Sequence, residues 1–384
     1  MQKEKLLMTP GPTMLPPDVL EVMRRQIIHH RTADFERTWE ELHENLKWIF
    51  GTEETVMTMC SSGTGAMEAT VVNLFSQGDK VLVVSIGAFG DRFAEIAKTF
   101  GLEVVKLAVE WGKSVNVADI KDILSEDMNN DIKGVLITHN ETSTGVTNDI
   151  KAVAELTKNT GRLLVVDAIS SLGGLELKMD EWGFDCVVTG SQKALMAPPG
   201  LSFIALSQKA WQACEKSTLP KFYWDLKKYK KGLDKLSENP PYTPAIVTVM
   251  AQAAALRLMK ADGKEKIYDR HQRAAKAVQK GVTALGLSLL ADESDSSYII
   301  TAVRAPEGID IGKVIKTLNN KFDIMITGGQ KHLKGKIFRI GHCGYFDEFD
   351  IIKTFAALEE ALFQEGYIFE KGASVNAVQK ELFK

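Results

Sequence analysis

Arg162-Leu-Leu-Val-Val-Asp167 is a run of four apolar residues between two charged ones, and it points most directly to the fold. Strands that are apolar on both faces are typical of parallel sheets that helices cover on both sides. Similar short runs alternate with amphipathic stretches before residue 207: Thr55–Cys60, Lys80–Ser85, Glu103–Ala108, Gly134–Thr138, Phe184–Thr189 and Leu201–Leu206. Strands that alternate with helices indicate βαβ units, so the sequence predicts an α/β fold with a mostly parallel sheet.

The length of the chain predicts more than one domain, because 384 residues exceed the roughly 100–200 residues of a single domain. We expect helices at Ala66–Phe75, Asp91–Phe100, Asn116–Ser125, Asp149–Thr160, Ala245–Lys260 and Lys264–Leu285, and a polar loop at Lys231–Pro244. Strands are expected later at Leu287–Leu290, Ser297–Val303 and Lys336–Gly341. The predicted division is an extended segment at residues 1–14, a large domain at 15–262 and a small α+β domain at 263–384. Pro10, Pro12, Pro16 and Pro17 are expected to exclude regular structure from the start of the chain.

The composition excludes several classes of protein. Apolar residues make up 45% of the chain and charged residues 25%, and the net charge is −3. These values exclude a disordered tail, a collagen and a disulfide-dense mini-protein, and the near-neutral charge argues against a nucleic-acid partner. The longest apolar stretches, such as Val81–Phe89, are far shorter than the about 20 residues of a membrane helix. The beginning of the chain shows no signal region, so we expect a cytoplasmic protein without membrane contact.

Metal and redox sites are not expected from the cysteines and histidines. The four cysteines form no C-x-x-C pair; they are Cys60, Cys186, Cys214 and Cys343. The seven histidines are scattered, and the adjacent His29 and His30 cannot share one face of a helix or strand.

The first chemical signal is the glycine-rich turn Ser61-Ser-Gly-Thr-Gly-Ala-Met-Glu68, which follows the strand Thr55–Cys60. In an open α/β sheet, ligands bind beyond the carboxyl ends of the strands. A small turn that opens a helix presents free N–H groups to an anion such as phosphate. A dinucleotide fingerprint fits poorly because its third glycine position is Glu68. A tight turn that needs glycine only for steric reasons is the other open interpretation.

Three further strand ends carry residues that suit one cofactor. Phe89 stands between two glycines, Asp167 closes an apolar strand, and Lys193 lies in an apolar loop framed by glycine and proline. Each also has a plainer interpretation, as a core aromatic, a helix N-cap and a surface charge. Together with the anion site they match pyridoxal 5′-phosphate (PLP), which needs a ring platform, a carboxylate for its ring N–H⁺, an amine for a Schiff base and a phosphate cradle.

With these motifs the chain resembles the class V, fold-type I, PLP-dependent aminotransferases, most of all the alanine–glyoxylate and serine–glyoxylate (serine–pyruvate) aminotransferases. The resemblance runs almost end to end. Its motifs are Leu7-Met-Thr-Pro-Gly-Pro12, Ser62-Gly-Thr-Gly65, His139-Asn-Glu-Thr-Ser-Thr-Gly145, Val166-Asp-Ala-Ile-Ser-Ser-Leu-Gly-Gly174, Gly190-Ser-Gln-Lys193 and Phe338-Arg-Ile-Gly341. It implies a large domain with a mostly parallel seven-stranded sheet between helices, and a smaller α+β C-terminal domain.

The resemblance also implies roles for individual residues. Lys193 would be the Schiff-base lysine and Asp167 the partner of the pyridine nitrogen. The other implied cofactor contacts are Thr64, Gly65, Ala66 and Gln192 at the phosphate, Phe89 and Ile169 on the two ring faces, Thr142 at the ring hydroxyl, and Tyr242 and Thr243 from the neighbouring subunit of a homodimer. Arg339 would grip the substrate carboxylate bidentately, and Gly11 would line the substrate pocket. Some members carry His where this chain has Ala66, Trp where it has Phe89 and Tyr where it has Pro240.

These features predict a transaminase that moves an amino group from alanine or serine to glyoxylate or pyruvate by a ping-pong mechanism. No second arginine lies within the motifs, which predicts small monocarboxylic substrates. Arg31 would overturn this prediction if it pointed into the pocket. The alternatives are a 2-aminoethylphosphonate or aspartate transaminase, a cysteine desulfurase with Cys343 beside His342 as its nucleophile, and a non-catalytic protein of the same fold.

Overall fold

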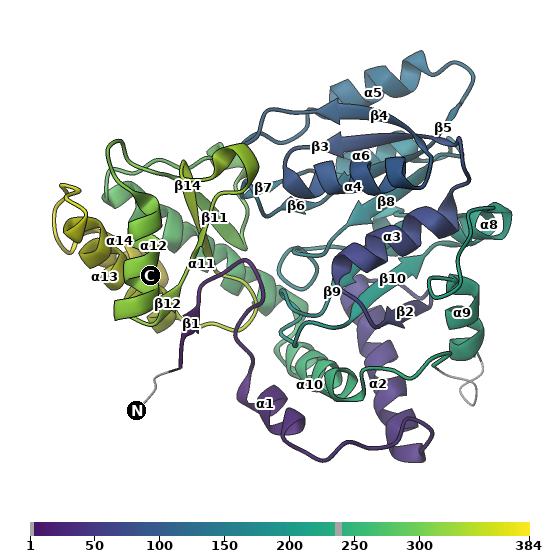
Figure 1. Ribbon diagram of the computed structural model, residues 1–384, viewed down its shortest axis with the longest axis horizontal. Helices are drawn as coiled ribbons and strands as arrows, with labels where there is room; N and C mark the ends of the chain where they lie inside the picture. Colours follow the sequence, from purple (N-terminus) through teal and green to yellow (C-terminus); the bar gives the residue numbers. More distant parts are fainter. Residues whose placement is uncertain (1–3, 235–239) are drawn as a thin grey trace.

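The computed structural model describes residues 4–234 and 240–384 and centres on a seven-stranded sheet (Figure 1). The strand order is β2-β10-β9-β8-β5-β3-β4. The strands are β2 (Val56–Met59), β3 (Lys80–Ser85), β4 (Glu103–Ala108), β5 (Ile132–Thr138), β8 (Leu163–Asp167), β9 (Cys186–Gly190) and β10 (Ser202–Leu206). Neighbouring strands are parallel except that β10 runs antiparallel to both β2 and β9. The prediction of a mostly parallel α/β sheet is confirmed.

Helices cover both faces of this sheet because its strands are apolar on both faces. In β8, Leu164 and Val166 pack into one core and Leu163 and Val165 into another. The first core includes residues of α1 (Pro17–Met23), α2 (Ala33–Phe50), α5 (Val117–Glu126), α6 (Ile150–Thr157), α7 (Met179–Trp182) and α10 (Ile246–Asp262). The second includes residues of α3 (Gly63–Leu74), α4 (Ala88–Thr99), α8 (Gln208–Lys216) and α9 (Leu226–Asp234).

The C-terminal part of the chain has a core of its own and lies to one side of the main sheet (Figure 1). Its helices are α11 (Lys264–Ala284), α12 (Ile311–Lys321), α13 (Glu348–Gln364) and α14 (Ala373–Leu382). Its antiparallel sheet has the order β11-β14-β13, formed by β11 (Ile300–Arg304), β14 (Ile337–Gly341) and β13 (Thr327–Gly328). The helix α10 ends at Asp262 and α11 begins at Lys264. The domain boundaries given above stay a prediction.

The N-terminal segment links the two parts. The strand β1 (Leu6–Leu7) pairs in parallel with β12 (Ile324–Met325) of the C-terminal part, and further along the chain α1 packs on α10 of the large part (Figure 1). The expectation that prolines exclude regular structure is therefore wrong for Leu6 and Leu7. These two residues precede the first proline and find an available strand to pair with.

Two other elements differ from the prediction. Leu287–Leu290 forms only an isolated bridge between Leu289 and Val303. The loop predicted at Lys231–Pro244 begins later than expected, because helix α9 runs on to Asp234. Leu226 and Tyr229 anchor this helix, since they are buried one turn apart. Residues 235–239 of that loop lie outside the described residues. Among the helices of the described ranges, none combines the length and the apolar composition that crossing a membrane requires.

Candidate active site

The predicted site residues gather at the carboxyl ends of the parallel strands, where Lys193 follows β9 and Asp167 closes β8. The Lys193 side chain is buried. Burial lowers the pKa of its amine, which Cys343 and Asp167 oppose and Arg339 and Arg92 reinforce. The charges of Asp167, Arg339 and Arg92 therefore act on one amine.

The N-terminal segment holds Lys193 in place. Its Nζ donates a hydrogen bond of 2.6 Å to the carbonyl oxygen of Pro10, and Thr13 Oγ1 donates one of 3.2 Å to the carbonyl oxygen of Lys193. Gly11 has a φ of +118°, and a Cβ on it would lie 2.3 Å from Lys193 Cδ. Only glycine fits at that position, so Gly11 forms a wall directly against the lysine.

Asp167 is a buried carboxylate held by a few donors. The backbone N–H of Ile169 donates to its Oδ1 at 2.9 Å, and Thr138 Oγ1 donates to its Oδ2 at 3.4 Å. Burial raises its pKa to about 6, with the charge of Glu141 adding to the rise. The side chain of Ile169 packs against Gly63 at the start of α3, where a Cβ would lie 2.5 Å away. A cation beside Asp167 would relieve the cost of its buried charge.

The start of α3 has the features of an anion site. Its N-cap, Ser62, makes no side-chain cap, and no hydrogen bond within the described part of the chain engages the N–H groups of Gly63 and Thr64. Gln192 adds a buried Oε1 that has no hydrogen-bond partner among the described residues. The Gln192 amide can turn to present its NH₂ to an anion in place of this oxygen, so a buried amide beside an uncapped helix start fits a phosphate.

Helix α3 begins three residues earlier than the sequence predicts, at Gly63 and not at Ala66. Ala66 is fully buried, and no hydrogen bond within the described part of the chain engages its N–H. The Gly65 N–H bonds to the carbonyl oxygen of Ser62 at 2.9 Å. The N–H groups that remain open to an anion are therefore those of Gly63, Thr64 and Ala66, which include two of the predicted positions.

Arg92, to which the sequence analysis assigns no role, lies beside two predicted cofactor residues. Its guanidinium carbon is 4.8 Å from the centroid of the Phe89 ring, and its Nη1 donates to Thr64 Oγ1 at 3.1 Å. The neighbouring Asp91 does not neutralise it, since Asp91 bonds Lys106 and Lys331 instead. The sequence gives no sign of the contact between Arg92 and Thr64, because the two residues lie 28 positions apart.

Arg339 is a buried guanidinium bound only by backbone carbonyls. Its Nε donates to Gly328 O at 3.0 Å and its Nη1 to Thr142 O at 2.8 Å. Burial lowers its pKa to about 10, and Glu141 partly opposes this. No carboxylate of the described residues forms an ion pair with it, so this planar cation is available to a carboxylate ligand. Thr142, predicted at the cofactor ring, is thereby tied to the substrate side as well.

Tyr242, Thr243 and Arg31 lie elsewhere in the chain. Tyr242 donates from its hydroxyl to Phe222 O at 2.9 Å and stacks on Tyr223 at a centroid distance of 5.0 Å. Thr243 and Arg31 are exposed. The roles proposed for Tyr242 and Thr243 belong to the site of a partner subunit and stay predictions.

Cys343 lies close to Lys193 but is a poor nucleophile. It is buried, and burial raises the pKa of its thiol to about 12. Since the thiolate is the reactive form, this geometry disfavours the cysteine desulfurase alternative. In the described ranges, no group of three or more His, Cys, Asp or Glu side chains is arranged to hold a metal ion.

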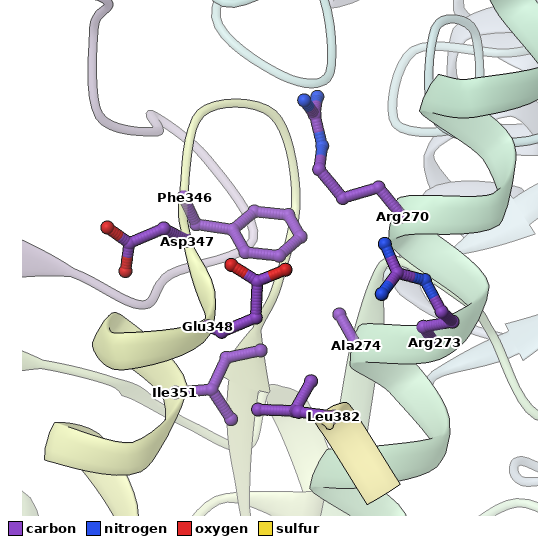
Figure 2. A pocket seen from close by; sticks show the side chains of 8 residues that line it. All are labelled: Arg270, Arg273, Ala274, Phe346, Asp347, Glu348, Ile351 and Leu382. Atoms are coloured by element: carbon purple, nitrogen blue, oxygen red, sulfur yellow. The ribbon is translucent and has the colours of Figure 1, made fainter. Parts of the chain in front are cut away.

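The hollow drawn in Figure 2 is a separate feature of the C-terminal part. Three residues of α11 line one side, and five residues before and within α13 and in α14 line the rest: Arg270, Arg273 and Ala274, and Phe346, Asp347, Glu348, Ile351 and Leu382. Its volume is about 10 Å³, and a single water molecule needs roughly 10–15 Å³. It has no room for an amino acid.

Comparison with known proteins agrees with this geometry. Residues 6–342 match the family model described as Aminotransferase class-V. The chain belongs to the class V aminotransferases. The predicted family and fold type are confirmed, and the protein is a transaminase.

Three proteins that are similar to this chain carry different names. It is 42% identical to a protein of Synechococcus sp. named the small subunit of a soluble hydrogenase, over 100% of this chain and 99% of that one. It is 37% identical to the serine–glyoxylate aminotransferase of Methylorubrum extorquens, over 98% and 95%. The crystal structure of the ureidoglycine–glyoxylate aminotransferase of Bacillus subtilis superposes with a TM-score of 0.95 at 29% identity, over 100% and 99%.

Proposed function

We propose that this class V transaminase uses PLP to move an amino group from alanine or serine to glyoxylate or pyruvate by a ping-pong mechanism. One observation carries the proposal. Lys193, Asp167 and Arg339 are all buried, and none of the three forms an ion pair within the described part of the chain. Buried charges without partners are costly, so the site is complementary to a ligand that brings an electrophile, a ring N–H⁺ and a carboxylate.

The residues present fit the cofactor. Lys193 would bind its aldehyde carbon and Asp167 its pyridine nitrogen, while Phe89 and Ile169 would cover the two ring faces. Thr142 would reach the ring hydroxyl. For the phosphate we propose Gln192, Thr64 and Ala66, together with the N–H of Gly63, with Arg92 supporting Thr64 from behind. When bound, the cofactor supplies an electron sink that stabilises the electron pair left on the substrate Cα.

The protein residues then divide the work. Arg339 binds and orients the α-carboxylate of the substrate with its planar donors. The lowered pKa of Lys193 favours the neutral amine at Nζ, which would accept a proton from the substrate Cα and deliver it to the former aldehyde carbon of the cofactor. Asp167 supplies a negative charge that keeps the ring nitrogen protonated.

The substrate class is proposed from the cations around the site. Arg339 is the buried arginine at its substrate side, and Arg31 is exposed. A single carboxylate anchor favours small monocarboxylic acids. A relative named for serine and glyoxylate supports the same choice.

We also propose that the enzyme is a homodimer in which Tyr242 and Thr243 of one subunit contact the phosphate bound by the other. Both residues follow the proline-bearing stretch of the loop, and Thr243 is exposed in the single chain.

The purified protein, loaded with PLP, tests the proposal through the absorbance of the bound cofactor. Alanine or serine alone should convert the spectrum to that of the aminated cofactor, and glyoxylate should restore it. A protein that binds PLP but whose spectrum no amino acid changes would be a non-catalytic member of the fold. Formation of alanine from cysteine, with sulfide released on addition of a thiol reductant and without amino transfer, would instead support the desulfurase alternative.

A further inference from the structure

Glu141 is a fully buried carboxylate whose four hydrogen-bond donors come from two different segments. Its Oε2 accepts from the backbone N–H groups of Phe89 at 3.0 Å and Gly90 at 3.1 Å. Its Oε1 accepts from the backbone N–H of Ser143 at 3.1 Å and from Ser143 Oγ at 2.6 Å. No lysine or arginine of the described residues forms an ion pair with it. The Glu141 carboxylate is therefore held by neutral donors, which are three backbone N–H groups and one hydroxyl.

These contacts cap the start of α4 with residues that lie far away in the sequence. The N-cap residue of α4, Gly87, has no side chain, and a Cβ there would lie 2.3 Å from Glu141 Cγ. Ser143 Oγ accepts from the N–H of Ala88 at 2.9 Å. The N–H groups of the first three helical residues, at 88, 89 and 90, are thus all satisfied by residues 141–143 and not by the local sequence.

The same loop reaches the substrate side of the site. The carbonyl oxygen of Thr142 accepts from Arg339 Nη1 at 2.8 Å. Phe89 and Arg339 come from distant elements, α4 and β14, and they meet through residues 141–143. A shift of this loop would move the ring platform and the carboxylate anchor together.

We propose that Glu141 is a positioning residue that fixes Phe89 and Arg339 relative to each other, so that the cofactor ring and the substrate carboxylate are held in register. The inference rests on the proposed function and adds a role for a residue outside the cofactor and substrate contacts. The geometry requires a carboxylate, because both oxygens accept from backbone N–H groups, so the NH₂ of a glutamine would oppose one of them in either orientation.

The test is the variant Glu141→Gln in the full-length enzyme. We expect the dissociation constant of PLP and the KM of both substrates to rise about 10-fold each, a loss of binding that leaves kcat within about threefold of the native value. PLP affinity is measured by titrating the cofactor-free protein and following absorbance, so that one readout does not depend on turnover.

Asp127→Asn is the matched control. Asp127 is also a buried carboxylate, paired with Arg162 at 2.9 Å, and it accepts from the backbone N–H groups of Asp131 and Ile132. It lies at the amino end of β5, opposite the end that leads to Glu141. Its loss should lower the melting temperature and leave PLP affinity and KM unchanged.

Ser143→Ala keeps the Glu141 charge but removes one donor to it and the acceptor for Ala88. It should give a smaller rise in both constants, and it decides the question alone if Glu141→Gln does not fold. The inference is overturned if both variants lose stability while PLP affinity and KM stay within twofold of native. If the native protein itself fails to bind PLP, the proposed function is overturned. This result differs from the one above, in which the native protein binds PLP and only the role of Glu141 is overturned.

Discussion

At the scale of single residues, Asp167 lowers the stability of the cofactor-free protein at neutral pH, and it is the residue proposed to hold the protonated ring nitrogen of the cofactor. Its pKa is raised by burial to about 6, from an ordinary value of 3.8. The folded, cofactor-free protein therefore holds the Asp167 proton more tightly than the unfolded chain does. Stability from this group is present at low pH, falls as the pH rises through the window between these two values, and stays lost above it.

Asp167→Asn should consequently stabilise the cofactor-free protein at pH 7.5 by roughly 3 kcal/mol, and by about half as much at pH 5. Urea unfolding of both proteins at the two pH values measures the difference. Activity of the variant should fall at least about 100-fold, because an amide does not hold the charge of a ring N–H⁺. A stability difference that does not change with pH would contradict the assignment of this pKa.

Lys193 gives a second prediction at the residue scale. Lys193→Ala should abolish transamination and prevent the covalent fixation of PLP by borohydride, because its amine is the one that reaches the cofactor site from the loop after β9. Peptide mapping of the reduced protein is the measurement. Labelling of another lysine in the variant would place the site elsewhere.

The sequence identifies such residues only where a strand end marks them. Lys193 and Asp167 follow predicted strands, and Arg339 lies in a recognised motif. Glu141 lies within a quoted motif too, yet its partners Phe89 and Gly90 are about 50 positions away. No local pattern distinguishes a glutamate that caps a remote helix from one in a solvated loop.

At the scale of elements, the main sheet was predictable because its strands carry their own signal. β3 and β4 begin and end at the predicted residues, since each run is rich in valine and leucine and is clearly bounded. β1 was not predictable, because two residues become a strand only when β12 lies beside them. The start of α3 was predicted three residues late because glycines favour turns and helix starts alike.

Close packing of α11 gives a prediction at this scale. A Cβ on Gly281 would lie 2.6 Å from the Phe355 ring of α13 and 2.7 Å from Val378 of α14. Alanine gains about 1 kcal/mol of helix propensity, but overpacking costs about 1–3 kcal/mol. Gly281→Ala should therefore lower the free energy of unfolding, while activity per folded molecule is unchanged.

Urea unfolding measures this change, with Thr283→Ala on the exposed face of the same helix as the control. The control should stay within about 0.5 kcal/mol of native. Equal stability of Gly281→Ala and native protein would mean that α13 and α14 move apart freely, and that the packing seen here is not tight.

At the scale of the whole molecule, the proposed homodimer shares each cofactor site between two subunits. Thr243→Ala should weaken PLP binding by roughly 1.5–3 kcal/mol, the value of one hydrogen bond to a charged group. Dialysis against buffer without PLP, followed by absorbance, measures retention. Thr99→Ala, an exposed threonine at the far end of α4, should retain PLP as the native protein does. A monomer by sedimentation that keeps full activity at nanomolar concentration would contradict the shared site.

The size of substrate that the pocket accepts also belongs to this scale, because it depends on every cation that reaches the pocket. Arg339 is buried and binds Thr142 O and Gly328 O, whereas Arg31 is exposed on the segment between α1 and α2. A dicarboxylate such as 2-oxoglutarate needs a second cation for its distal group, since an unpaired buried carboxylate is costly. Catalytic efficiency with glyoxylate should therefore exceed that with 2-oxoglutarate by at least about 10-fold.

Two variants separate the carboxylate sites. Arg339→Lys should leave the absorbance of bound PLP intact but raise KM for every substrate at least about 10-fold, because one ammonium group does not replace a planar guanidinium that serves two carbonyls and a carboxylate. Arg31→Gln should leave the ratio of efficiencies for glyoxylate and 2-oxoglutarate unchanged. If 2-oxoglutarate instead matches glyoxylate in the native enzyme and Arg31→Gln abolishes that activity, the exposed arginine reaches the pocket of the partner subunit. The protein would then be a transaminase for dicarboxylic acids.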